Sequence, residues 1–171
     1  YGAIEGENTL EIYDLAGNKT EYKFTLDTKA PSRVYSTVRL SEEKEANYVE
    51  QDGNKYYYVK NGDSFEFAMA FTEELKQVPT VTIGGRNVEM VLNEKVKQEE
   101  SKYLYEGTFT IGKDEQGLQE GNLEIKVSNI VDFAENEMEE TIETPTSNGR
   151  VVVYDRTGAG YTVKSESKGT E

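Results

Sequence analysis

The sequence contains no cysteine, no histidine and no tryptophan. Zinc sites with thiolate or imidazole ligands, Ser-His-Asp and Cys-His nucleophiles, disulfides and c-type haem attachment all require Cys or His, so each of these is excluded. Most familiar hydrolase mechanisms are excluded for the same reason. We therefore predict that the chain is not an enzyme and that it requires no cofactor.

Basic residues are scarce as well, since 19 Lys and Arg stand against 33 Asp and Glu and the formal net charge is −14. Nucleic-acid phosphates and anionic lipid headgroups attract positive charge, so we expect no nucleic-acid partner. No apolar run is long enough to cross a bilayer, and direct membrane insertion is not expected either. The excess of carboxylates can instead attract calcium, which prefers carboxylate and carbonyl oxygens.

Apolar and polar residues alternate with a period of two along most of the chain, which is typical of half-buried antiparallel strands. In SFEFAMAF, residues 64–71, the apolar face consists of Phe65, Phe67, Met69 and Phe71. Gly84 and Gly85 suit a two-residue hairpin turn. Strands are expected at residues 34–40, 56–59, 64–71, 81–83, 87–92, 103–111, 123–129 and 151–154. Short strands about ten residues apart predict an all-β fold, an antiparallel β-sandwich with Greek-key topology.

Three polar stretches interrupt this pattern, at residues 41–54, 72–79 and 112–121. The first contains SEEKEA, for which a solvated loop is favoured over a helical turn. The second contains TEELKQV, which is compatible with one short helical turn at the edge of the sandwich.

One pattern is repeated within the chain, and such internal similarity indicates a repeat architecture. GENTLEIYDLAGNKTEYKFTLDTKAP has a looser counterpart in EGNLEIKVSNIVDFAENEMEETIE followed by RVVVYDRTGAG. The alignment matches Leu10 and Ile12 with Leu123 and Ile125, DLAGN with DFAEN, and LDTKAP with YDRTGA. An N-terminal hairpin therefore corresponds to the last part of the module that follows it.

The order G-x-N-L-x-I, D-x-A-G-N, an alternating strand and D-T-x-A-P resembles the end of bacterial immunoglobulin-like (Ig-like) and fibronectin-III-like repeats, which are strung head to tail in cell-surface proteins. Residues 58–85, with a Gly-Asp turn, a long alternating strand and an acidic Thr-Glu step, look like the opening half of such a repeat. The resemblance covers most of the chain. The second copy departs from it, because Glu135 replaces the glycine and TPTSNG interrupts the final strand.

The resemblance implies three parts: residues 1–31 as the C-terminal hairpin of a preceding repeat with its linker, 32–157 as a complete Ig-like sandwich, and 158–171 as a linker or the start of a following repeat. It implies a non-catalytic module of a secreted bacterial surface protein of the Gram-positive cell wall, acting as stalk, spacer or adhesive contact. The alternatives are an accessory domain of a secreted enzyme, either a cell-envelope subtilisin-like protease or a glycoside hydrolase, and a carbohydrate-binding module. Expected partners are neighbouring Ig-like modules of the same chain and a host or cell-wall protein or glycan.

Oxygen ligands at the module joints form the sharpest candidate site. The pattern predicts two groups, one at an end of the N-terminal hairpin and one at the corresponding end of the main domain: Asp14, Asn18 and Asp27, and Asp132, Asn136 and Asp155. The resemblance implies that calcium bound at such joints stiffens a rod. The spacing does not match an EF-hand loop, and turn capping alone also accounts for each residue.

Three other kinds of site are not favoured by the pattern. Glycosidases need one acid in an apolar cleft and a second acid nearby, whereas Asp and Glu are expected here over loops and outward strand faces. Successive tyrosines in YYY, residues 56–58, must point to opposite faces of a strand, so we expect at least one to pack inward. An exposed aromatic platform for glycans is the alternative. No lysine shows the buried pattern that a Lys-Asn isopeptide bond requires.

Overall fold

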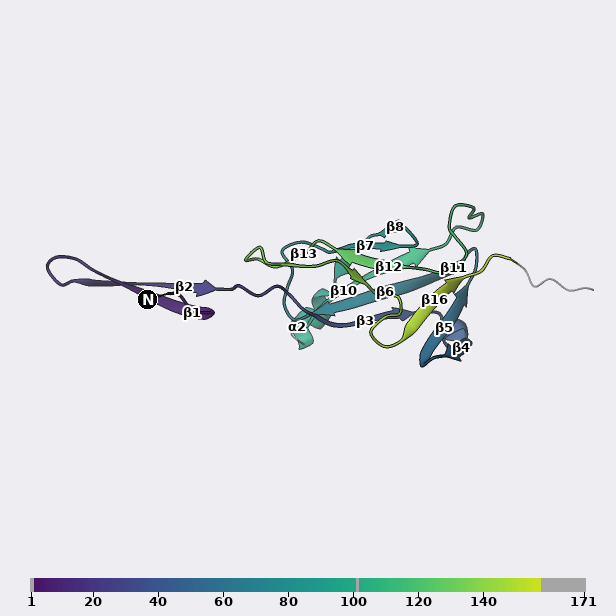
Figure 1. Cartoon of the computed structure of the whole chain (residues 1–171), viewed down its shortest axis with the longest axis horizontal. Coiled ribbons are helices and arrows are strands. Elements are labelled where there is room, and N and C mark those ends of the chain that lie inside the picture. Colours follow the sequence, from purple (N-terminus) through teal and green to yellow (C-terminus); the bar gives the residue numbers. More distant parts are fainter. Residues whose placement is uncertain (1, 101, 158–171) are drawn as a thin grey trace, which may run out of the picture.

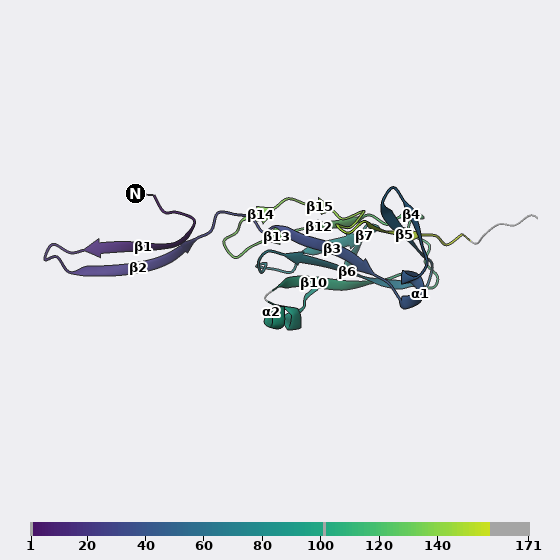
Figure 2. The ribbon, with the colours of Figure 1, turned by 90° about the horizontal axis from the view of Figure 1, so that it is seen from below.

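The computed structural model describes residues 2–100 and 102–157, which form an elongated molecule of two parts (Figure 1). A two-stranded hairpin projects from one end of a larger body of packed sheets (Figures 1 and 2). The predicted all-β class is confirmed, because strands dominate the described residues and the two helices are short. The predicted linker or following repeat at 158–171 lies outside the described residues.

The hairpin consists of β1 (Gly6–Tyr13) and β2 (Lys19–Leu26), which pair antiparallel along their whole length. Alternation places four large apolar side chains on one face, each between 37% and 63% exposed: Leu10, Ile12, Tyr22 and Phe24. The rings of Tyr22 and Phe24 stack with their centroids 6.4 Å apart. A hairpin alone is only marginally stable in water, and the exposure of these side chains shows that no other described element covers this face.

One layer of the body is a four-stranded sheet in the order β3-β6-β10-β9. Its strands are β3 (Arg33–Arg39), β6 (Ser64–Phe71), β10 (Tyr103–Thr110) and β9 (Val91–Leu92). β6 has the predicted bounds, but its second face is covered as well. There, Ala68 and Ala70 pack with Leu104 beneath Tyr35 and Val96. Val96 belongs to α2 (Glu94–Glu100), a short helix outside β10 (Figure 2) that the sequence pattern did not predict.

The opposite layer contains two further sheets, in the orders β11-β16-β5-β4 and β15-β12-β7-β8. The strands of the first are β11 (Gly121–Asn122), β16 (Arg150–Tyr154), β5 (Asn54–Val59) and β4 (Tyr48–Gln51). Those of the second are β15 (Thr141–Ile142), β12 (Ile125–Ser128), β7 (Thr80–Ile83) and β8 (Arg86–Val88). A short ladder joins β13 (Ile130–Val131) to β14 (Glu137–Met138). β16 runs parallel to β5, whereas the other paired strands of the described residues are antiparallel, as predicted.

The two layers enclose one continuous hydrophobic core. Its members come from both layers and include five side chains that are at most 1% exposed: Phe67, Ile83, Val127, Ile130 and Val152. Aromatic contacts between neighbouring strands add to it, with ring centroids 5.5 Å apart for Phe65 and Phe109 and 5.9 Å apart for Phe71 and Tyr105. Alternating inward-facing residues from facing sheets are the arrangement of a β-sandwich.

Two predicted segments are wrong in detail. Residues 41–54, expected as a loop, form α1 (Glu42–Glu45) and β4. Asp52 and Gly53 then join β4 to β5 with φ of 52° and 77°, the positive values of a type I′ hairpin turn, for which Asp-Gly is a preferred pair. The expected strand at 87–92 is split into β8 and β9. At the break, the Glu89 carbonyl lies so close to Gly107 of β10 that a Cβ there would collide with it.

Candidate metal centre at the joint between hairpin and sandwich

The tip of the hairpin is closed by an aspartate turn between β1 and β2. Asp14 Oδ1 accepts hydrogen bonds from the backbone amides of Ala16 (2.9 Å) and Asn18 (2.8 Å), and Asn18 Nδ2 donates to Asp14 Oδ2 (2.7 Å). Gly17 takes a φ of 86°, which glycine tolerates without steric cost. The hydrogen bonds from Asn18 hold the pKa of Asp14 below its ordinary value. Both oxygens of this carboxylate are therefore engaged within the turn.

The sandwich contains the same turn between β13 and β14. Asn136 donates its backbone amide to Asp132 Oδ1 (2.8 Å) and its Nδ2 to Asp132 Oδ2 (2.9 Å). Glu135 occupies the position of Gly17 and takes a φ of 70°. The aligned segments DLAGN and DFAEN thus share their backbone and side-chain bonding. Their surroundings differ, since Asp132 is 1% exposed whereas Asp14 is exposed at the hairpin tip.

Asp27 does not lie with Asp14 and Asn18, so the prediction that these three share one end of the hairpin is wrong. The whole of β2 separates them, because Asp27 follows Leu26, the last residue of that strand. Asp27 instead approaches the sandwich. Its carbonyl oxygen accepts a hydrogen bond of 3.1 Å from Asn136 Nδ2, which links the open end of the hairpin to the turn in the sandwich.

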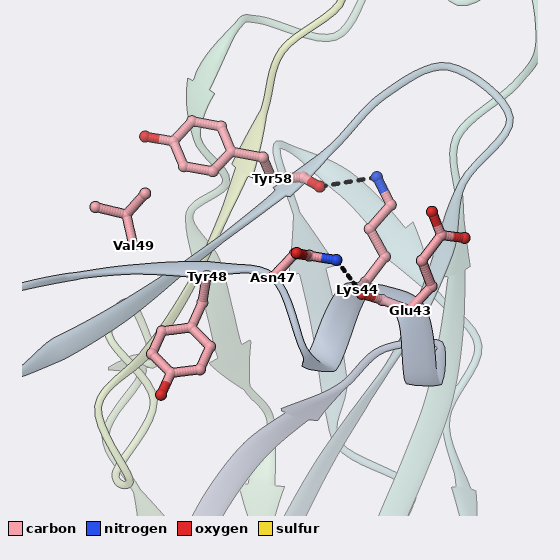
Figure 3. Close-up of a pocket in the computed structure, with 6 residues that line it drawn as sticks. All are labelled: Glu43, Lys44, Asn47, Tyr48, Val49 and Tyr58. Carbon is pink, nitrogen blue, oxygen red and sulfur yellow. Dashed lines mark hydrogen bonds between the residues drawn. The ribbon is translucent and has the colours of Figure 1, made fainter.

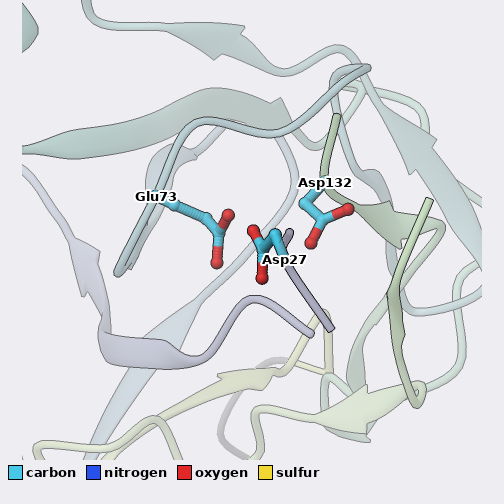
Figure 4. Close-up of side chains that lie close together, drawn as sticks. All are labelled: Asp27, Glu73 and Asp132. Atoms are coloured by element: carbon cyan, nitrogen blue, oxygen red, sulfur yellow. The ribbon is translucent and has the colours of Figure 1, made fainter. Parts of the chain in front are cut away.

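At this joint the carboxylate of Asp27 meets those of Glu73 and Asp132 (Figure 4). One oxygen from each lies within 4.8 Å of the other two. Calcium binds oxygen at about 2.3–2.6 Å, so two ligand atoms of one ion are at most about 5 Å apart. Within the described residues, no salt bridge joins any of the three carboxylates to Lys or Arg. Three uncompensated hard ligands at this spacing suit one divalent cation.

Glu73 was not among the predicted ligands. It lies in the connection between β6 and β7, which forms no helical turn and is held in place at two points. Thr72 exchanges two hydrogen bonds with Ser32, of 2.9 and 3.0 Å, and the Lys76 amide donates to the Val131 carbonyl (2.8 Å). The Thr-Glu step in the sequence is the signal that points to this residue.

The carboxylates at the joint differ in their titration. Burial and repulsion from Asp27 and Asp132 raise the pKa of Glu73. Burial acts in the same direction on Asp132, but hydrogen bonds from Asn136 and the turn amides outweigh it and lower the pKa of that residue. Asp132 is therefore ionised at neutral pH, and Glu73 lies in its field. A bound divalent cation would remove this repulsion.

Asp155 lies beyond β16, at the opposite end of the sandwich from the joint, so the second predicted group is also wrong (Figure 1). Its backbone amide donates to the Val59 carbonyl (2.9 Å), and its Oδ1 accepts from the Thr157 amide (3.0 Å). The six predicted ligands thus occupy three places, the hairpin tip, the joint and the far end. The joint brings three of them together: Asp27, Asp132 and Asn136.

Three carboxylates depart from the expectation that acidic side chains are solvated, because Glu115, Asp132 and Glu143 are buried. The most buried of them is Glu143, which is 0% exposed. Its oxygens accept hydrogen bonds from Arg33 (2.7 and 2.8 Å) and from the Ser36 hydroxyl. Ser36 in turn exchanges hydrogen bonds with Ser147. This network fastens β3 to the segment before β16, and the ion pair with Arg33 compensates the charge of Glu143, so the group is structural.

The tyrosine run has one inward-facing member, as expected, because Tyr57 is 1% exposed while Tyr58 is 46% exposed. Tyr58 borders an open pocket of about 390 Å³ beside β4, lined by Glu43, Lys44, Asn47, Tyr48, Val49 and Tyr58 (Figure 3). Lys44 Nζ donates to the Tyr58 carbonyl (3.0 Å), and Asn47 Nδ2 donates to the Glu43 carbonyl (2.7 Å). The rings of Tyr48 and Tyr58 point to different sides of β4, so they do not form a clamp.

Neither a protein-family model nor a curated protein sequence matches this chain. Within residues 2–100 and 102–157, no helix has the length and apolar character needed to cross a membrane. Three features of the molecule bear on its function: the side chains at the joint, the repeated turn and the pocket beside β4.

Proposed function

We propose that this chain is a non-catalytic, Ig-like module of a tandem array in a secreted bacterial surface protein, where it acts as a spacer, stalk or adhesive contact. The observation that carries the proposal is the repeated aspartate turn, because a hairpin outside the sandwich is built like a hairpin inside it. Its neighbours would be Ig-like modules of the same polypeptide. The location at the cell surface follows from the resemblance of the D-x-A-G-N and D-T-x-A-P motifs.

The apolar face of the hairpin supports the same proposal. An isoleucine stands two residues before the aspartate of each turn, Ile12 in the hairpin and Ile130 in the sandwich. Ile130 is 0% exposed in the core, whereas Ile12 is 54% exposed. The sequence alignment matched Ile12 with Ile125 instead, because the sandwich copy carries extra residues here, among them Asn129 with a φ of 55°. The hairpin face thus has the composition of half a core and fits the second layer of another sandwich.

We further propose that calcium binds at the joint and stiffens it. Asp27 comes from the hairpin side, whereas Glu73 and Asp132 come from the sandwich side, so a shared ion would cross-link the two parts. Asn136 already holds the Asp27 carbonyl and keeps this carboxylate near the other two. Relative motion is the default for parts of a chain that meet through a small interface. A bound calcium ion would hold the hairpin and the sandwich at a fixed angle, which a spacer requires.

Calorimetric titration of calcium into the full chain tests the site. Glu73→Gln removes one charged ligand without altering either turn, and Glu50→Gln, on the exposed strand β4, is the matched control. We expect Glu73→Gln to weaken binding by about tenfold or more, because the number of charged ligands tunes calcium affinity. Calcium should also raise the melting temperature of the wild type by mass action. Absence of binding heat, or equal affinity in both variants, would contradict the site.

Residual dipolar couplings measured by NMR test the spacer role. In millimolar calcium, the hairpin and the sandwich should share one alignment tensor, and in chelator they should show two. A single tensor in both conditions would mean that calcium does not control the joint. Turnover of any substrate by the purified chain would refute the non-catalytic assignment.

The pocket beside β4 favours glycan binding as a second function. The half-exposed Tyr58 ring and Val49 offer an apolar platform, and the Glu43 carboxylate offers an acceptor for sugar hydroxyls. NMR titration with N-acetylglucosamine oligomers and with galactose tests it. Tyr58→Ala should abolish the shifts, whereas Tyr13→Ala, which alters an exposed tyrosine on the hairpin, should preserve them. If neither sugar shifts the pocket resonances, this function is ruled out.

A further inference from the structure

Two glutamates close two strand ends in the same way. Glu5 accepts hydrogen bonds from the backbone amide (3.1 Å) and the hydroxyl (2.6 Å) of Thr28. Glu120 accepts them from the amide (2.8 Å) and the hydroxyl (2.7 Å) of Thr157. We call these contacts the Glu5 clasp and the Glu120 clasp. The first closes the open end of the hairpin, and the second closes the C-terminal end of the sandwich.

The strands around the two clasps also correspond. Each glutamate precedes a glycine with positive φ, 93° at Gly6 and 113° at Gly121. Each glycine pairs with the last residue of its partner strand, and an aspartate follows that strand, Asp27 after β2 and Asp155 after β16. Both aspartates accept a hydrogen bond from the amide two residues further on, at 3.1 and 3.0 Å. The threonine lies one position later in the second case, but the construction of the two ends is the same.

The end closed by the Glu5 clasp already carries a docked sandwich in this structure. The Asp27 carbonyl receives the side-chain amide of Asn136, and the carboxylates of Glu73 and Asp132 lie beside Asp27. A sandwich that docks on such an end therefore presents its Asp-x-Ala-x-Asn turn and its Thr-Glu segment. The far end of this molecule has the same clasp and the same aspartate, with its own carbonyl oxygen at Asp155.

We infer that the C-terminal end of the sandwich, formed by Glu120, Asp155 and Thr157, is the docking surface for a following Ig-like module of the same polypeptide. The asparagine of that module's Asp-x-Ala-x-Asn turn donates to the Asp155 carbonyl, as Asn136 does to Asp27. The Glu120 clasp sets the direction in which the chain leaves β16. This inference rests on the proposed tandem array and names the chemistry of the partner within it.

The full chain with residues 30–157 duplicated in tandem tests this surface. In that protein, Thr157 of the first copy precedes Ala30 of the second copy, so the Glu120 clasp is retained. Two residues then separate Asp155 from Ala30, as two separate Asp27 from Ala30 at the first joint. Residual dipolar couplings of the hairpin and of both sandwiches, measured in millimolar calcium, should fit one alignment tensor. Independent motion is the default for modules joined by a short connection, so a shared tensor is informative.

Variants of the clasp make the test specific. Glu120→Ala in the first copy should give the second sandwich its own tensor, whereas Glu124→Ala, a nearby exposed control, should leave the shared tensor unchanged. Thr157→Val in the first copy removes the hydroxyl that Glu120 holds and should loosen the joint in the same way. This second variant keeps the test valid should Glu120→Ala disturb folding of the first copy.

The outcomes separate this inference from the proposed function. If the second sandwich moves independently while the hairpin and first sandwich share a tensor, the inference is overturned and the first joint stands. If the hairpin also moves independently of the first sandwich, the proposed joint fails and the inference fails with it. A tensor that stays shared in both clasp variants would show that Glu120 has no part in docking, which also overturns the inference.

Discussion

The two aspartate turns of this molecule have the same hydrogen bonds and opposite surroundings. At the hairpin tip, Asp14 and Asn18 bond only within the turn and lie exposed. In the sandwich, Asp132 is buried, and Asn136 reaches beyond the turn to the carbonyl of Asp27. A local motif thus sets the same backbone path twice, and only one copy takes part in a candidate site. Neighbouring elements decide whether the motif serves as a tip or as a joint.

The largest expected difference between the two copies concerns the isoleucine before each turn. Ile130→Ala should cost about 2–5 kcal/mol of unfolding free energy, because it opens a cavity in the core. Ile12→Ala should change it by no more than about 0.5 kcal/mol, as is usual for exposed positions. Urea denaturation followed by circular dichroism measures both. Similar losses in the two variants would mean that the hairpin face is buried in solution.

The second-largest expected difference in stability concerns the asparagine of each turn. Asn136→Ala removes the side-chain donor to Asp132 Oδ2 and to the Asp27 carbonyl, while the backbone amide of residue 136 still donates to Asp132 Oδ1. We expect a loss of about 1–3 kcal/mol, because Oδ2 is left buried without this partner. Asn18→Ala disturbs only the exposed tip and should lie within about 0.5 kcal/mol of the wild type. Chemical denaturation of both proteins gives the comparison. A neutral Asn136→Ala would show that the joint contributes nothing to the stability of the sandwich.

Substituting the residue with positive φ in the sandwich turn should change the unfolding free energy less, and in the stabilising direction. A non-glycine residue in this region carries strain of about 1–2 kcal/mol, so Glu135→Gly should stabilise the sandwich by about 1 kcal/mol or less. Its exposed ion pair with Lys76 offsets little of that gain. Gly17→Ala should weaken the hairpin tip, which amide hydrogen exchange can detect. Destabilisation by Glu135→Gly would indicate that the ion pair outweighs the strain.

The smallest expected effect is the pH dependence of the joint without calcium. Because the pKa of Glu73 is raised on folding, the folded state holds this proton more tightly than the unfolded chain does. The stability that this proton contributes is therefore lost as the pH rises from the pKa of Glu73 in the unfolded chain through its pKa in the folded state. In chelator, Glu73→Gln should be more stable than the wild type at pH 7 and equal to it below pH 4. Melting temperatures of both proteins between pH 4 and pH 7 test this expectation. A lower melting temperature of Glu73→Gln at pH 7 would mean that a cationic group pairs with Glu73 in the wild type.

The strands of the body were largely predictable, because alternation is a local property. The bounds of β6 agree with SFEFAMAF, and Phe67 faces the core as its pattern indicates. β4 was missed although Asp52-Gly53, a strong hairpin signal, stands directly after it. α2 could not be found in this way, because a polar helix of seven residues has too few apolar positions for a periodicity.

The candidate site was predicted in part. Asp27, Asp132 and Asn136 were named as ligands, but they were assigned to two separate groups, and Glu73 was absent from both. The position of Asp27 could be predicted from the sequence, because a strand of eight residues at about 3.3 Å per residue spans roughly 26 Å. That length excludes Asp27 from the turn end. Which residues meet it at the other end depends on how the sandwich packs.

The sequence by itself determined the alternation of the strands and the geometry of both aspartate turns. Each depends on bonds among residues a few positions apart, and these form wherever the motif occurs. Only the tertiary structure decided that Asp27, Glu73 and Asp132 meet and that Ile130 is buried while Ile12 is not. Those outcomes come from contacts between distant segments, and their free energy depends on the whole core rather than on any local pattern.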